Sequence, residues 1–159
     1  MKVGFGYDSH KFVEGRKLFL GCVEIPHDKG LLGHSDADVV IHAISDALLG
    51  ATGQGDIGSH FPDTDQSFKD MTGMKLLQTV NSMIMMKMFE VEHIDATIVI
   101  EKPRIKDYTN QMVAKISEIL RISNDRVNIK VKSNEGMRWI GHGEGVASCA
   151  VVTVKKKVL

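Results

Sequence analysis

Apolar and polar residues alternate at the start of the chain, which is typical of a β-strand with two unlike faces. One face carries Val3, Phe5 and Tyr7, and the other carries two glycines followed by two polar residues: Gly4, Gly6, Asp8 and His10. Because glycine has no side chain, the second face is open over its first half. We expect another part of the protein to approach closely there.

Similar patterns predict the remaining elements. An apolar period close to 3.6 residues indicates a helix, and alternation or a short apolar run next to proline indicates a strand. Ser35 is placed to cap the first helix, with Asp38 three residues later. The expected order is strands at about 3–10 and 18–25, a helix at 35–49, a loop at 53–70, a helix at 71–89, a strand at 94–101, a helix at 108–121, and strands at 127–131 and 146–154.

This order of elements predicts an α+β fold. We expect a mixed β-sheet with helices packed on one of its faces. The length of 159 residues is that of one ordinary domain, and neither a linker nor an internal repeat divides residues 1–159. A single domain is therefore expected.

Composition narrows the expected partners. The 20 Lys and Arg residues balance the 20 Asp and Glu residues, whereas proteins that bind nucleic acids or membranes usually carry a basic excess. Neither partner is expected, and neutrality favours self-association. Cys22 and Cys149 match no metal or disulfide pattern and are expected to be free thiols. Without a leader-like or membrane-spanning pattern, we expect a cytoplasmic protein.

Asp8 and His10 are two residues apart on one strand face, so their side chains point the same way. His42, on the polar side of the predicted first helix, is the candidate third ligand. Asp46, one helical turn later, is the candidate that orients the His42 imidazole. Two histidines and a carboxylate with a free fourth position form the ligand set of a catalytic zinc site. Non-haem iron accepts a similar set, and a chance Asp-x-His pair with a surface histidine is the alternative.

Other polar groups are candidates for binding phosphate or sugar. The start of the predicted first helix, with His34 and Ser35, presents N–H groups to an anion, although a plain helix cap explains the same residues. The loop at 56–58 and 61–65 offers carboxylates for hydroxyls or Mg²⁺, or is simply rich in turn residues. Glu135, where a predicted strand ends, offers a ligand for a second cation.

Together these motifs resemble the 2-C-methyl-D-erythritol 2,4-cyclodiphosphate synthase family. The resemblance covers essentially the whole chain and rests on residues 4–10, 33–43, 46–50, 55–58, 61–65 and 141–145. It implies a metal-dependent lyase of non-mevalonate isoprenoid (terpenoid) biosynthesis, which converts 4-diphosphocytidyl-2-C-methyl-D-erythritol 2-phosphate into the cyclodiphosphate and CMP. It also implies a homotrimer around a threefold axis, with active sites between subunits.

The resemblance further implies roles for individual residues. The implied metal ligands are Asp8, His10 and His42 for Zn²⁺, and Glu135 for Mg²⁺ or Mn²⁺. The implied transition-state stabilisers are His34 and Ser133. The implied substrate contacts are Asp8, Ser9, His10, His34, Ser35, Asp56, Ile57, Gly58, Phe61, Pro62, Asp63, Thr64, Asp65, Ile100, Glu101, Lys102, Pro103, Arg104, Ile105, Lys106, Lys132, Ser133, Asn134, Glu135, Trp139 and His142.

Two rival interpretations differ in function class. One is a zinc phosphohydrolase in which Asp56 or Asp63 serves as the base, and the other is a non-catalytic trimer that holds zinc structurally. A structural zinc site normally has four protein ligands. Since the sequence offers three convincing ligands, catalysis is favoured over a structural role.

Overall fold

The centre of the protein is a five-stranded sheet in the order β4-β1-β7-β5-β6. The structure is a computed structural model and describes residues 1–158. β5 and β6 run parallel and the other neighbours run antiparallel, so the sheet is mixed. The strands are β1 (Lys2–Glu14), β4 (Lys29–Leu31), β5 (Phe89–Val99), β6 (Val127–Lys132) and β7 (Gly145–Lys156).

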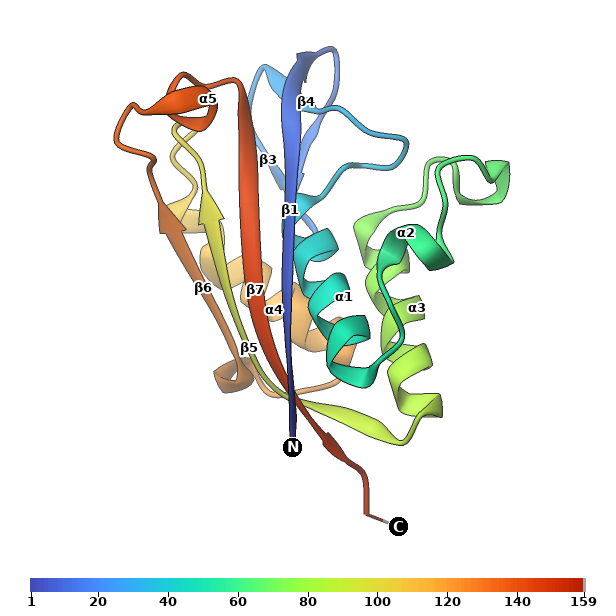
Figure 1. The fold of residues 1–159 in the computed structure, drawn as a ribbon. Helices are drawn as coiled ribbons and strands as arrows, with labels where there is room; N and C mark the ends of the chain where they lie inside the picture. Colours follow the sequence, from blue (N-terminus) through green and yellow to red (C-terminus); the bar gives the residue numbers. More distant parts are fainter. Residues whose placement is uncertain (159) are drawn as a thin grey trace.

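Three long helices lie to one side of this sheet (Figure 1). They are α1 (Val39–Thr52), α3 (Gly73–Met86) and α4 (Thr109–Leu120). Alternate residues of β5, such as Ile94 and Ile98, form a core with helix residues such as Ile44 and Ile116, all of them fully buried. The predicted mixed sheet with helices on one face is therefore confirmed. Within residues 1–158, no helix combines the length and apolarity needed to cross a bilayer.

Helix α1 lies unusually close to β1 because two glycines face it. A Cβ atom on Gly4 would come within 1.9 Å of the Ala47 carbonyl oxygen, and one on Gly6 within 1.9 Å of the Ala43 carbonyl oxygen. Any side chain would force the helix away from the strand. The open face predicted from the sequence is thus filled by the backbone of α1.

The sequence predicted one continuous strand at 18–25, and this prediction is wrong. The structure has a hairpin of β2 (Leu18–Leu20) and β3 (Val23–Ile25), which pair antiparallel. Gly21 and Cys22 between them both have positive φ, 59° and 64°, as two-residue hairpin turns require. The apolar run hid the turn because Cys22, a non-glycine residue, adopts the left-handed conformation.

The predicted cap of the first helix is also wrong. α1 begins at Val39, and its cap is Asp38, which accepts a hydrogen bond from the Ile41 N–H at 3.2 Å. The Asp38 carboxylate also accepts from the N–H groups of Gly21 (2.9 Å) and Cys22 (2.7 Å) in the hairpin turn. Ser35 instead accepts from the Ala37 N–H at 3.1 Å, in the turn before the helix. Asp38 is the cap because its carboxylate accepts hydrogen bonds from three backbone N–H groups at once.

The segment at 53–70, expected to be a loop, contains two short helices, and further short elements were not predicted. Neither the strand β4 nor the helix α5 was predicted. The additional helices are α2 (Ile57–His60), η1 (Gln66–Phe68), η2 (Lys106–Tyr108), η3 (Asn124–Arg126) and α5 (Arg138–Gly141). Elements of three or four residues are too short to show a period in sequence.

Candidate metal centre and active site

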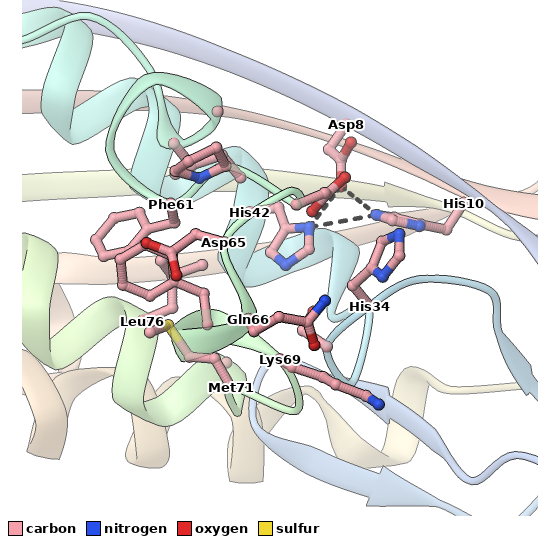
Figure 2. Close-up of a pocket in the computed structure, with 17 residues that line it drawn as sticks. Asp8, His10, His34, His42, Phe61, Asp65, Gln66, Lys69, Met71 and Leu76 are labelled. Atoms are coloured by element: carbon pink, nitrogen blue, oxygen red, sulfur yellow. Dashed lines mark hydrogen bonds and ion pairs between the residues drawn. The ribbon is translucent and has the colours of Figure 1, made fainter.

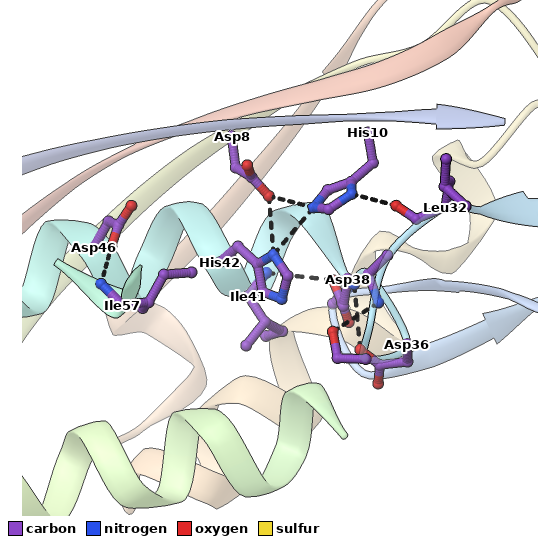
Figure 3. Close-up of polar contacts among 12 residues, drawn as sticks. Asp8, His10, Leu32, Asp36, Asp38, Ile41, His42, Asp46 and Ile57 are labelled. Atoms are coloured by element: carbon purple, nitrogen blue, oxygen red, sulfur yellow. Dashed lines mark hydrogen bonds and ion pairs between the residues drawn. The ribbon is translucent and has the colours of Figure 1, made fainter. Parts of the chain in front are cut away.

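Asp8 and His10 on β1 meet His42 on α1, where the side chains of strand and helix face one another (Figure 3). The Asp8 Oδ2 atom lies 2.9 Å from His10 Nε2 and 2.9 Å from His42 Nδ1, and the two nitrogens are 3.2 Å apart. Three ligand atoms, all within 4.8 Å of one another, therefore face a common point. This donor set, two imidazoles and one carboxylate, suits zinc with one position left for another ligand.

The backbone around the triad fixes how each side chain is presented. His10 Nδ1 lies 2.6 Å from the carbonyl oxygen of Leu32. A carbonyl only accepts, so Nδ1 carries the proton and Nε2 is left with its lone pair toward the triad. The support comes from the segment after β4, which no sequence pattern pointed to.

The predicted support for His42 is wrong. Asp46 accepts a hydrogen bond from the Ile57 N–H at 2.7 Å, so its carboxylate anchors the start of α2 and does not orient the imidazole. His42 is also not on a polar helix side, since only Asp46 and Gly50 of α1 escape burial. α1 lies between the sheet and α3, and both of its faces are covered (Figure 1).

The electrostatics of the triad favour a bound cation. Burial opposes ionisation of Asp8, but hydrogen bonds and charges of His10 and His42 outweigh it and lower the Asp8 pKa to about 2. For His10, burial lowers the pKa, and the Asp8 carboxylate more than reverses this and raises it. A carboxylate that stays ionised and draws positive charge onto the neighbouring His10 is the environment in which a divalent ion replaces a proton.

A cavity of about 620 Å³ opens in front of the triad (Figure 2). It is walled by β1, the start of α1, and the segment from α2 to the start of α3. Many of the predicted site residues line it: Asp8, His10, His34, Ser35, His42, Ile57, Gly58, Phe61, Pro62, Asp63 and Asp65. A cavity of this volume fits a small organic ligand.

The wall that carries His34 is held by two cross-links. Arg16 donates to the carbonyl oxygens of Gly33, at 2.7 Å, and of Ser35, on either side of His34. The Asp70 N–H donates to the carbonyl oxygen of His34 itself at 3.0 Å. His34 thus faces the cavity from a backbone that is tied on two sides.

Three predicted contacts of this half do not line the cavity. Asp56 caps α2 and accepts from the Ser59 N–H at 2.8 Å. Ser9 lies on the opposite face of β1 from Asp8, and Thr64 is exposed at the tip of the loop. The sequence did not single out six other residues that line the cavity. The first four follow the acidic loop, which was the only signal for them, and the last two belong to α3: Gln66, Phe68, Lys69, Met71, Gly73 and Leu76.

The second half of the predicted site forms a separate cluster. Glu101, just after β5, accepts hydrogen bonds from the N–H groups of Asn134 (3.0 Å) and Gly136 (3.3 Å), and Ser133 donates to Glu135 at 3.1 Å. The predicted residues that belong to this region are 100–106, 132–135, Trp139 and His142. Their roles stay predictions, as do those in the cavity.

The two halves lie at the same end of the sheet but on different strands. Asp8 is in register with Ser148 of β7, Ser148 with Ile98 of β5, and Ile98 with Val131 of β6. Three strand spacings of about 4.8 Å put β6 roughly 14 Å from β1. Within one chain, the structure therefore does not bring Glu135 onto the triad.

Comparisons with known proteins agree with this architecture. The model of the YgbB family matches residues 1–155. The 2-C-methyl-D-erythritol 2,4-cyclodiphosphate synthase of Alkaliphilus metalliredigens (strain QYMF) is 53% identical over 154 residues, which is 97% of either chain. That of Syntrophus aciditrophicus (strain SB) is 50% identical over 156 residues, which is 98% of either chain.

Solved structures show the same fold. The bifunctional IspDF from Campylobacter jejuni superposes with a TM-score of 0.94 at 38% identity, and the match covers 98% of this chain but 42% of that longer protein. IspF from Plasmodium falciparum, solved as a CDP complex, superposes with a TM-score of 0.86 at 29% identity, covering 99% of this chain and 97% of that one. From its first residues to residue 155, this chain is a member of the YgbB family, whose relatives are 2-C-methyl-D-erythritol 2,4-cyclodiphosphate synthases.

Proposed function

We propose that this chain converts 4-diphosphocytidyl-2-C-methyl-D-erythritol 2-phosphate into 2-C-methyl-D-erythritol 2,4-cyclodiphosphate and CMP. The observation that carries the proposal is the triad of Asp8, His10 and His42, which opens on a ligand-sized cavity in a member of this family. The bond that forms joins a 2-phosphate oxygen to the β-phosphorus. The bond that breaks joins the β-phosphorus to the oxygen of the α-phosphate, and CMP leaves with the electron pair.

No side chain has to act as a nucleophile, because the attacking phosphate is already an anion. The protein must instead bring two phosphates together and balance their charge. Asp8, His10 and His42 would hold a zinc ion, which when bound supplies Lewis-acid polarisation of the β-phosphate. His34, on its tethered backbone, donates a hydrogen bond where negative charge develops.

The loop residues 61–65 enclose the methylerythritol portion. Phe61 and Pro62 give that side of the cavity an apolar wall, and Asp63 and Asp65 give it acceptors for the polyol hydroxyls. A wall of this composition keeps the flexible chain folded with its ends close together. The cytidyl and second-cation part is assigned to Ser133, Glu135 and residues 100–106.

Product analysis tests the function. Purified protein incubated with the diphosphocytidyl substrate, Zn²⁺ and Mg²⁺ is expected to release CMP and the cyclic product in equal amounts. In water enriched in ¹⁸O, neither product should gain the label at the new bond. A linear phosphate that carries ¹⁸O would identify a phosphohydrolase and refute the proposal.

Metal removal should abolish turnover without unfolding the protein. The triad lies at a cavity wall, with side-chain exposures of 11–25%, whereas the core is apolar and independent of it. We expect the chelated protein to keep its far-UV circular dichroism spectrum, and to regain activity with Zn²⁺ plus Mg²⁺ but not with Mg²⁺ alone. Normal turnover by protein shown to be metal-free would contradict the assignment.

We also assign this chain to a homotrimer with shared active sites. The sheet face opposite the helices leaves Val3, Phe5 and Tyr7 exposed by 66%, 66% and 54%, and Val151, paired with Phe5, is exposed by 42%. An exposed apolar patch of this kind supports association. Because the triad and the Glu135 cluster lie on different strands at one end of the sheet, a neighbouring copy is well placed to complete the cavity with its own cluster.

Mixed trimers test the sharing of sites. His42→Ala lacks a zinc ligand and Glu135→Gln lacks the ligand of the second cation, so each variant alone is expected to be nearly inactive. When the two chains are co-expressed with different tags and purified through both, some sites combine an intact triad with an intact Glu135. CMP release by the mixed trimers is expected to rise well above that of either parent. No gain over the parents would show that each site is built within one chain.

A further inference from the structure

The side chains that line the cavity carry more negative than positive charge, so they repel a phosphate-rich substrate unless cations offset them. Three carboxylates line it, those of Asp8, Asp63 and Asp65, and among its lining residues Lys69 is the only lysine or arginine. The substrate of the proposed function brings a diphosphate and a further phosphate into this acidic space. Like charges in a partly closed cavity repel strongly, so every fixed cation at the wall has a large effect.

Lys69 is held next to the segment that carries His34. Its own N–H donates to the Gln66 carbonyl oxygen at 3.2 Å, and the N–H of the next residue, Asp70, donates to the His34 carbonyl oxygen at 3.0 Å. Lys69 therefore immediately precedes a residue whose backbone is hydrogen-bonded to the backbone of His34. Figure 2 shows both side chains at the same side of the cavity, with Gln66 nearby.

The short helix before Lys69 is itself braced against the cavity wall. The Phe68 and Phe61 rings pack edge to face with centroids 5.3 Å apart. Asp65 accepts from the Ser67 N–H at 2.9 Å and, through its carbonyl, from the Phe68 N–H at 3.1 Å. The backbone that presents Lys69 is thus fixed, while its four-carbon side chain is free to follow a phosphate.

Position decides which phosphate Lys69 meets. The zinc ion that the triad would hold lies on the β-phosphate side of the proposed substrate, and the cytidyl side belongs to the Glu135 cluster after β6. Lys69 follows residues 61–65, which enclose the methylerythritol portion, after the single short helix η1. The phosphate attached to that portion is the 2-phosphate, the group that attacks.

We propose that Lys69 binds the 2-phosphate of the substrate and holds it beside His34, a role that rests on the proposed function. The ammonium group donates to a 2-phosphate oxygen that does not form the new bond. It offsets part of the repulsion between the two phosphates as they approach, and it takes no proton, since the attacking oxygen is already ionised. Lys69 is a substrate-positioning residue at a place that the sequence motifs did not include.

Charge at position 69 is the first variable to test. Lys69→Gln is expected to lower kcat/KM by roughly 10- to 100-fold, the range for losing a charge-assisted hydrogen bond. Lys69→Arg, which keeps the charge, is expected to recover most of the loss. Lys75→Gln removes an exposed lysine from α3 outside this cavity and should leave kcat/KM unchanged. Equal losses in the glutamine and arginine variants would overturn the proposal.

Binding of matched ligands gives a second, independent measurement. In calorimetry with the zinc-loaded protein, Lys69→Gln should weaken binding of the substrate, yet leave CMP and the analogue without the 2-phosphate bound as in the parent protein. If the variant weakens all three ligands alike, or none of them, Lys69 does not contact the 2-phosphate. Failure of the proposed function is distinguishable, because the parent protein itself would then yield neither CMP nor cyclic product.

Discussion

Replacing His42 with alanine is expected to leave the fold intact and to remove both bound zinc and most turnover. The imidazole provides one of three ligand atoms, with Nδ1 at 2.9 Å from Asp8 Oδ2. Lewis-acid stabilisation is worth several kcal/mol, and each ~1.4 kcal/mol is a factor of ten in rate. We therefore expect kcat to fall by at least about 100-fold, measured as CMP release, together with a loss of zinc measured by elemental analysis.

A second histidine provides the control for this substitution. His27 lies outside the cavity, where its ring packs edge to face on Phe12 with centroids 5.4 Å apart. His27→Ala should keep stoichiometric zinc and parental kcat, so a general effect of losing a histidine is excluded. A His42→Ala protein with full zinc and normal turnover would disprove the ligand assignment.

Adding a single methyl group at Gly6 is expected to harm both stability and metal binding. The new Cβ would lie 1.9 Å from the Ala43 carbonyl oxygen and 2.8 Å from the Ala47 nitrogen. Overpacking typically costs about 1–3 kcal/mol, and contact with a helix backbone, which cannot rotate away, puts Gly6→Ala near or above the upper end, at about 3–4 kcal/mol. Because α1 must move from β1, His42 should also move from Asp8, and zinc affinity should fall.

Gly50→Ala is the matched control, since it adds the same methyl group at a glycine of α1, the helix that faces Gly6. A Cβ at Gly50 meets nothing within 4 Å, and alanine favours helix by roughly 0.5–1 kcal/mol over glycine. This variant should be as stable as the parent or slightly more so in urea unfolding, with unchanged zinc affinity. If Gly6→Ala behaved like Gly50→Ala, the close approach of α1 to β1 would not be what positions the site.

The sequence predicted the Asp8 and His10 part of the triad from a short-range rule, whereas His42 was a candidate whose assignment came from the family resemblance. Asp8 and His10 share a strand face by period two, and the glycines before them signalled a close approach. What approaches could not be deduced, because that depends on how α1 packs across the sheet. The same limit explains the error at Asp46, whose partner Ile57 is fixed by tertiary packing and not by the helix period.

The cavity wall was predicted only in part for a related reason. Residues 61–65 stood out as acidic turn residues, whereas Gln66, Lys69 and Met71 have no distinctive spacing. Their place at the cavity follows from the backbone bond between Asp70 and His34, which joins positions 36 residues apart in the chain. No local pattern encodes such a contact.

The buried carboxylate of Asp38 has a consequence for anyone who redesigns this chain. It fixes the rotational phase of α1, because the helix must start there to keep its bonds to Gly21 and Cys22. Inserting or deleting one residue between positions 38 and 42 would rotate His42 by about 100° about the helix axis. Chain length in those few residues is therefore not adjustable, whereas the turn after α1, beginning at Gly53, is free of that constraint.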